Sequence, residues 1–133
     1  MSAGEILLLD DDEDLRQALS DFVKTTSGRS CLSLPDYAAL AANRGRALAC
    51  DLALLDVNLG EGQPSGVDAY EWLRRERFAG RILFLTGYGP NHPLVQRAGK
   101  VGGPEVLSKP IDLDELRRIL ASEGGTYGLR AWR

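Results

Sequence analysis

Short apolar runs alternate with longer stretches of helical periodicity along this chain, and the alternation repeats five times. The first run, residues 5–9, is followed over residues 13–25 by apolar side chains at helical spacing. Such alternation is typical of a parallel sheet whose strands are joined by helices. The pattern therefore predicts a doubly wound α/β domain, with a five-stranded parallel sheet and helices on both faces.

The remaining strands and helices follow in the same order. We expect strands at residues 30–34, 51–56, 81–86 and 104–108, and helices at residues 37–49, 67–78, 91–100 and 112–121. Asp12, Asp36 and Asp112 stand where N-caps are needed, while Gly28 and Gly80 follow the expected ends of two helices. The third strand is the most hydrophobic segment of the chain, which predicts a place at the centre of the sheet.

Length and composition indicate one folded domain in a reducing compartment. The chain has 133 residues, of which 44% are hydrophobic and 26% charged. A net charge of -3 without a basic run gives no indication of direct nucleic-acid binding. No apolar stretch approaches the roughly 20 residues of a membrane span, and residues 1–5 do not resemble a signal peptide, so we expect a cytoplasmic protein. Cys31 and Cys50 lack metal-ligand spacing and are expected to be small buried hydrophobic residues.

Polar residues stand at the ends of four expected strands. Asp10 and Asp11 follow the first, Asp56 ends the third, Thr86 ends the fourth and Lys109 follows the fifth. In a sheet of order 2-1-3-4-5 these carboxyl ends meet at the crevice where ligands bind. Crowded carboxylates resist ionisation unless a cation compensates their charge. The arrangement therefore predicts a functional site rather than surface decoration.

These residues also form a family pattern. The segments Asp10-Asp11-Asp12, Leu54-Leu55-Asp56, Thr86-Gly87 and Lys109-Pro110 resemble, in order and spacing, those of the receiver domain of two-component response regulators. The resemblance extends over residues 5–121. It implies a flavodoxin-like fold of strand order 2-1-3-4-5, with the receiver domain at residues 4–122. Residues 123–133, which include Trp132, are expected to be a tail with no output domain.

The resemblance also implies a role in signal transduction. Asp56 is then the residue that takes a phosphoryl group from a sensor histidine kinase or a histidine phosphotransfer protein. The domain would act as a conformational switch or a phosphorelay intermediate, and would catalyse only its own phosphorylation and slow dephosphorylation. An unidentified downstream protein would read the switch, and the face of the last two helices is a candidate homodimer surface.

The resemblance to receiver domains also implies a magnesium site. Asp11, Asp56 and the backbone carbonyl of Asn58 would bind Mg²⁺ directly, and Asp10 would bind it through a water molecule. A phosphatase of the haloacid dehalogenase type also uses a strand-terminal Asp and Mg²⁺. It requires a second Asp two residues later, where this chain has Asn58, and the sequence therefore disfavours it.

The two remaining residues of the pattern are expected to contact the phosphoryl group. By resemblance, Thr86 donates a hydrogen bond to one phosphoryl oxygen and Lys109 pairs with another. The peptide bond between Lys109 and Pro110 is expected to be cis. Val106 occupies a position where many receivers carry an aromatic switch residue. We therefore expect the signal to pass through the loop after Thr86, where Tyr88 is also expected to shield the phosphoryl group from water.

A receiver-shaped interaction module that is never phosphorylated remains the alternative. Val106 favours it, because the usual aromatic relay is absent. The complete set of Asp10, Asp11, Asp56 and Lys109 argues against it, since such modules need none of these side chains. Taken singly, Thr86 is an ordinary strand-end residue and Lys109-Pro110 an ordinary linker, so only their joint occurrence indicates phosphoryl chemistry.

Overall fold

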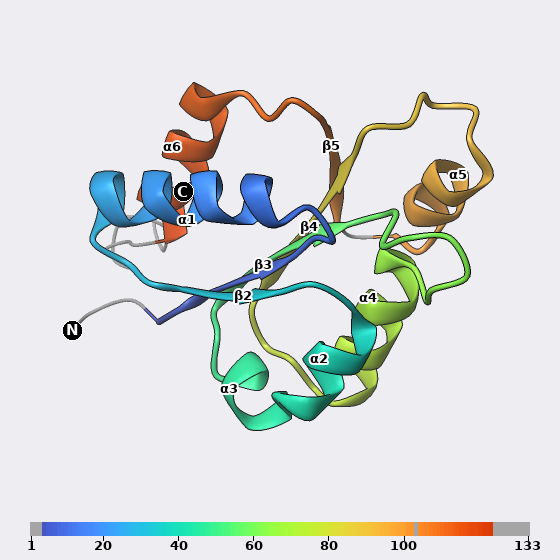
Figure 1. The fold of residues 1–133 in the computed structure, drawn as a ribbon, viewed down its shortest axis with the longest axis horizontal. Helices are drawn as coiled ribbons and strands as arrows, with labels where there is room; N and C mark the ends of the chain where they lie inside the picture. Colours follow the sequence, from blue (N-terminus) through green and yellow to red (C-terminus); the bar gives the residue numbers. More distant parts are fainter. Residues whose placement is uncertain (1–3, 103, 124–133) are drawn as a thin grey trace.

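A five-stranded parallel sheet forms the centre of the protein in the computed structural model, which describes residues 4–102 and 104–123 (Figure 1). The strands are β1 (Ile6–Leu9), β2 (Cys31–Leu34), β3 (Leu52–Asp56), β4 (Arg81–Thr86) and β5 (Glu105–Ser108). Their order is β2-β1-β3-β4-β5, and every neighbouring pair is parallel. The predicted fold and strand order are confirmed. The expected tail with Trp132 lies outside the described residues apart from its first position.

Helices cover both faces of the sheet. The helices are α1 (Glu13–Ser27), α2 (Tyr37–Ala42), α3 (Arg44–Leu48), α4 (Gly66–Arg75), α5 (Pro93–Lys100) and α6 (Leu113–Glu123). Figure 1 shows α1 and α6 on one face and α2, α3 and α4 on the other, with α5 beside the carboxyl end of the sheet. Across the described ranges, no helix combines the length and apolarity that a membrane crossing requires.

Strands β1 and β3 divide their side chains between two apolar clusters, one on each face of the sheet. On β1, Ile6 and Leu8 pack with residues of α1 and α6, whereas Leu7 and Leu9 pack with residues of α2 to α5. Successive side chains of a strand point to opposite faces, so a strand covered on both sides must be apolar throughout. All five residues of β3 are buried, which confirms its predicted central place.

The helix expected over residues 37–49 is two short helices instead. At Asn43, between α2 and α3, the backbone leaves the helical conformation, with φ -112° and ψ 32°. The Asn43 side chain donates a hydrogen bond of 2.8 Å to the carbonyl of Ala39. Asparagine competes for backbone groups in this way, and the competition explains an interruption that the alanine-rich sequence does not predict.

The helix expected over residues 67–78 ends earlier, at Arg75. Arg77 adopts a left-handed conformation with φ 65°, and the amide of Phe78 donates to the carbonyl of Leu73 at 2.8 Å. This turn inserts the Phe78 side chain into the core, where 3% of it is exposed. Gly80 is therefore not the helix cap. A Cβ at Gly80 would lie 2.6 Å from the carbonyl oxygen of Asp51, so close packing requires glycine there.

The expected N-caps are confirmed by hydrogen bonds. The side chains of Asp12, Asp36 and Asp112 accept from backbone amides three residues later, at 3.1, 2.9 and 3.3 Å. Both cysteines are free, with Cys50 buried and Cys31 partly buried. Burial raises the pKa of Cys31 to about 11 and that of Cys50 to about 12. Both thiols are therefore protonated at neutral pH, as expected for packing residues.

Candidate functional site

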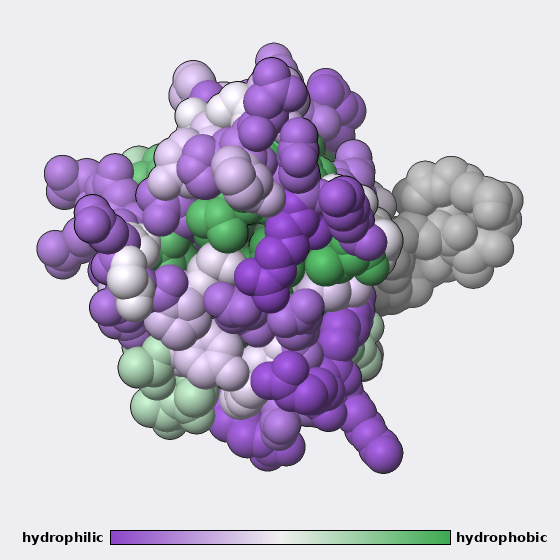
Figure 2. Space-filling model, turned by 90° about the vertical axis from the view of Figure 1, so that its right-hand side faces the viewer, coloured by the Kyte–Doolittle hydropathy of each residue, from purple (hydrophilic) through white to green (hydrophobic). Residues whose placement is uncertain are grey.

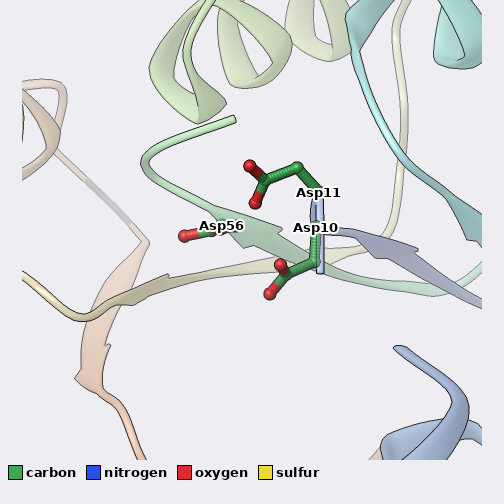
Figure 3. A group of neighbouring side chains, drawn as sticks. All are labelled: Asp10, Asp11 and Asp56. Carbon is green, nitrogen blue, oxygen red and sulfur yellow. The ribbon is translucent and has the colours of Figure 1, made fainter. Parts of the chain in front are cut away.

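Three carboxylates meet at the carboxyl end of the sheet. Asp10 and Asp11 follow β1 and Asp56 ends β3, and these strands are neighbours in a register that pairs Leu9 with Leu55. One carboxylate oxygen from each Asp lies within 4.8 Å of the others. Figure 3 shows the three side chains around a common space. Asp10 and Asp56 are only 3% and 4% exposed, whereas Asp11 is exposed to solvent.

One ammonium group enters this cluster from the end of β5. Lys109 Nζ lies 2.8 Å from Asp10 Oδ2 and 3.2 Å from Asp56 Oδ2. The Lys109 backbone amide donates to the carbonyl of Thr86 at 2.7 Å, and the bond to Pro110 is cis, as expected. Among the described residues, Lys109 is the one cation that forms ion pairs with the three-carboxylate cluster, so the site carries an excess of negative charge.

The pKa values of the site reflect this excess. Burial, and secondly the charge of Asp10, raise the pKa of Asp56 to about 7, although Lys109 and the amide of Asn58 act in the opposite direction. Burial acts to lower the pKa of Lys109, but its hydrogen bond to Asp10 and the charges of Asp56 and Asp10 outweigh burial and raise it. The ammonium therefore remains charged. Asp56 would be ionised more readily if a further cation were bound.

The β3–α4 connection holds Asp56 by its backbone. The amide of Asn58 donates to Asp56 Oδ1 at 3.3 Å, while Asn58 Oδ1 accepts from the amide of Gly60 at 3.1 Å. A Cβ at Gly66 would lie 2.1 Å from the carbonyl oxygen of Asp56, and the Gly66 amide donates to the carbonyl of Val57 at 2.9 Å. Only glycine allows α4 to begin this close to the strand. Sequence reasoning missed this requirement, because a glycine in a loop has no distinctive spacing.

Asp10 and Asp11 differ in the number of hydrogen bonds and ion pairs that their carboxylate oxygens accept. Asp10 Oδ1 accepts from the amide of Asp12 at 2.9 Å, and its Oδ2 faces the ammonium described above. The Asp10 carbonyl also accepts from Arg16 Nη1 at 2.6 Å, a contact that the sequence analysis did not anticipate. Within residues 4–102 and 104–123, no hydrogen bond or ion pair engages the Asp11 carboxylate. Asp11 is thus the carboxylate most available to a bound cation.

Thr86 lies beside the cluster without bonding to it. It ends β4, next to β3, and is 3% exposed. Its hydroxyl oxygen accepts from the amide of Tyr88 at 2.9 Å. Over the described part of the chain, no hydrogen bond joins the Thr86 hydroxyl to Asp56. The structure therefore brings Asp10, Asp11, Asp56 and Lys109 together and places Thr86 one strand away.

An open cavity gives access to the carboxylates. It has a volume of about 270 Å³, and its lining includes Asp11, Asp56, Asn58, Tyr88 and Lys109. Figure 2 looks onto this end of the molecule and shows a mostly hydrophilic surface with smaller apolar areas. Carboxylate oxygens are the ligands that Mg²⁺ prefers, so the donor set fits this ion. A small anion brought by the ion would have access to Asp56 and Lys109.

The family of the chain follows from a comparison with known domains. The response regulator receiver domain matches residues 6–121. The chain belongs to this family. Receiver domains are phosphoryl-accepting signalling switches that bind Mg²⁺ at an acidic pocket, and the cluster of Asp10, Asp11 and Asp56 fits that function.

Curated relatives are response regulators with longer chains. The receiver is 31% identical over 126 residues to the response regulator protein PilR of Pseudomonas aeruginosa, covering 92% of this chain and 26% of PilR. It is 34% identical over 121 residues to the photosynthetic apparatus regulatory protein RegA of Cereibacter sphaeroides, covering 90% of this chain and 62% of RegA. The chain thus spans less than two thirds of either relative.

Solved structures agree on the fold. The signal receiver domain of a LuxO repressor protein from Vibrio parahaemolyticus superposes with a TM-score of 0.76 at 21% identity, covering 98% of this chain and 96% of that one. The chemotaxis protein CheY4 of Vibrio cholerae superposes with a TM-score of 0.72 at 25% identity, covering 90% and 97%. The receiver fold is therefore shared at low sequence identity.

Proposed function

We propose that Asp56 is the phosphoacceptor of this receiver and that its donor is the phosphohistidine of a sensor histidine kinase or of a histidine phosphotransfer protein. A single observation carries the proposal. Asp56 is a buried carboxylate at the end of the central strand. It lies beside two other carboxylates and the Lys109 ammonium, and it lines an open cavity. Among the described residues Asp56 has no cation of its own, since Lys109 also pairs with Asp10.

The reaction is a displacement at phosphorus. An Asp56 carboxylate oxygen attacks the phosphorus atom, the P–N bond to the donor histidine breaks, and the departing imidazole takes up a proton from solvent. The product is an acyl phosphate on Asp56. Transfer of this kind depends mostly on positioning and on neutralising the phosphoryl oxygens. The amide of Asn58 orients the carboxylate, and Lys109 lies within reach of the incoming charge.

The residues for a magnesium ion are those expected from the family. Asp11, Asp56 and the backbone carbonyl of Asn58 would hold Mg²⁺, with Asp10 acting through a water molecule. When bound, Mg²⁺ supplies the positive charge that the cluster lacks and neutralises phosphoryl oxygens. Asp10 keeps Lys109 in place through their 2.8 Å contact. Asp11 contributes the carboxylate that no other described group engages.

The output is a change of surface rather than a turnover reaction. After phosphorylation Lys109 pairs with a phosphoryl oxygen, and the Thr86 hydroxyl turns from its contact with the Tyr88 amide to donate to another. The altered loop shifts the equilibrium between two surface arrangements that a protein partner distinguishes. We place this switch in the cytoplasm, where its kinase and downstream protein would meet it. Its only catalysis is its own phosphorylation and slow dephosphorylation.

Intact mass spectrometry tests the proposal directly. The protein is incubated with Mg²⁺ and acetyl phosphate, beside an Asp56→Asn control. We expect a phosphate-sized mass gain that requires Mg²⁺ and is absent from the control, because the amide cannot act as the nucleophile. No gain from fresh donor or from phosphorylated histidine phosphotransfer protein, with the protein folded, would instead support the unphosphorylated interaction module.

A further inference from the structure

Tyr88 stands between two cavities at the carboxyl end of the sheet. One is the reactive cavity of about 270 Å³ around Asp56. The other, of about 490 Å³, is mostly polar and extends over the β3–α4 loop to Arg97 of α5. Tyr88 and Asn58 are the residues that line both. Tyr88 and Asn58 therefore form the boundary between the larger cavity and the space around Asp56.

The backbone around Tyr88 does little to fix its ring. Gly87 and Gly89 flank it and are exposed, and glycine restricts the backbone less than any other residue. The Tyr88 amide donates to the Thr86 hydroxyl oxygen, a bond that fixes the backbone but not the ring. The ring must be positioned by a contact of its own.

His92 provides that contact. The imidazole and the Tyr88 ring are stacked, with centroids 3.7 Å apart and planes 6° from parallel. His92 is itself fixed, because its Nδ1 accepts from the amide of Leu94 at 3.1 Å and so caps α5. Its amide donates to the carbonyl of Gly89 at 3.2 Å. A ring held by a helix N-terminus thus supports a ring on a glycine-flanked loop.

We infer that His92 is a positioning residue that holds Tyr88 against the reactive cavity and so lengthens the life of the phosphoryl group on Asp56. The inference rests on the proposed phosphorylation of Asp56. Loss of the phosphoryl group is attack of a water oxygen on phosphorus with cleavage of the bond to the Asp56 oxygen. It yields the carboxylate and inorganic phosphate, and a proton passes to solvent. Without the imidazole, the Tyr88 ring leaves its place and water reaches the phosphorus from the larger cavity.

The stack can be tested before any phosphorylation. His92 is the only histidine of the chain, so its ring protons give isolated NMR signals. We expect them upfield of free histidine, because they lie above the Tyr88 ring, and we expect a Tyr88→Leu substitution to move them back. Signals that do not respond to Tyr88→Leu would overturn the inference.

Two His92 variants separate the stack from the helix cap. His92→Asn keeps a side-chain acceptor for the Leu94 amide and removes the ring, whereas His92→Phe keeps a ring and removes the acceptor. After phosphorylation with acetyl phosphate and removal of the donor, we expect His92→Asn to lose phosphate about two- to tenfold faster than the parent, which is the range that one aromatic contact controls. We expect His92→Phe to lose phosphate at the slower rate of the parent. We expect Tyr88→Ala to lose it as fast as His92→Asn, and the double variant to be no faster than either single variant.

The outcomes distinguish this inference from the proposed function. A parent protein that gains no phosphate overturns the proposed function and this inference with it. A parent that is phosphorylated, with an unchanged phosphate lifetime in His92→Asn, overturns this inference alone. Equally fast loss of phosphate in His92→Asn and His92→Phe also overturns it. His92→Phe keeps a ring, so an effect of the missing ring could not appear in that variant.

Discussion

The two ends of the sheet both carry charged side chains, but they balance charge differently. At the amino end, the Asp51 carboxylate pairs with the buried guanidinium of Arg29, and Glu5 pairs with Arg46 at 2.7 Å. Each acid there has its own arginine. At the carboxyl end, the only ion pairs that the described residues form with the cluster of Asp10, Asp11 and Asp56 come from the ammonium of Lys109.

The difference separates charges that serve the fold from charges that serve a function. A matched pair satisfies its own electrostatics, and removing one partner leaves the other without compensation. An unmatched cluster instead raises the pKa of Asp56 to about 7, mainly through burial and secondly through Asp10. Such a cluster destabilises the fold, so its benefit comes from a ligand, here a cation and a phosphoryl group.

The largest expected effect concerns phosphorylation. Asp11→Asn removes the carboxylate most available to a metal ion, and we expect at least about 100-fold slower phosphorylation by acetyl phosphate. Asp51→Asn is the matched control, because it also changes one carboxylate to an amide beside a strand of the same sheet. We expect it to be phosphorylated at the parent rate, as measured by intact mass against time. Comparable losses in the two variants would mean that the two ends do not differ in function.

Magnesium should stabilise only those variants in which the carboxylate cluster at the carboxyl end of the sheet is intact. Binding to the native state at about 100 times the dissociation constant adds about 2.7 kcal/mol to the free energy of unfolding. We expect an increase of this order in urea denaturation for the parent and for Asp51→Asn, with reversal by EDTA. In Asp11→Asn the increase should be absent. A similar magnesium response in all three proteins would point to binding elsewhere.

For the free energy of unfolding we expect the opposite ranking: substitutions at the amino end of the sheet should cost more than substitutions at the carboxyl end. Asp51→Ala leaves the Arg29 guanidinium, which is only 5% exposed, without its carboxylate. Loss of one partner of a buried pair costs about 3–5 kcal/mol, and because Asp51 is 37% exposed we expect about 2 kcal/mol. In magnesium-free buffer Asp56→Asn should be at least as stable as the parent, since it removes a buried like charge. Urea midpoints of the two variants give the comparison.

The smallest effect is a pH dependence at the amino end. The hydrogen bond from Arg46 lowers the pKa of Glu5, although burial acts in the opposite direction. A carboxylate with a lowered folded-state pKa stabilises the protein above its unfolded value of 4.5 and loses that effect as pH falls through the folded value. We therefore expect Glu5→Gln to be slightly less stable than the parent at pH 7, and we expect this difference to shrink as the pH falls below 4.5. A stability difference that does not shrink on acidification would rule out the Glu5–Arg46 pair as its cause.

Much of the fold could be predicted because its signals are local. All five strands lie where the sequence indicates, and so do the caps at Asp12, Asp36 and Asp112. The ends of two helices could not be predicted, because other contacts decide them. The Asn43 side chain divides one helix, and the burial of Phe78 stops another. Neither event changes the hydrophobic periodicity from which helices are predicted.

Which residues reach the site follows from the order of apolar runs and polar residues along the chain, since strands of a parallel sheet carry their terminal residues to one edge. Asp10, Asp11, Asp56 and Lys109 could thus be chosen before any coordinates were known. How these charges are shared, and which side chains lie beside them, depends on the packing of segments that are distant in the sequence. The stacking of His92 on Tyr88 depends on where α5 begins relative to β4. Contacts across loops depend on distances that no periodicity encodes.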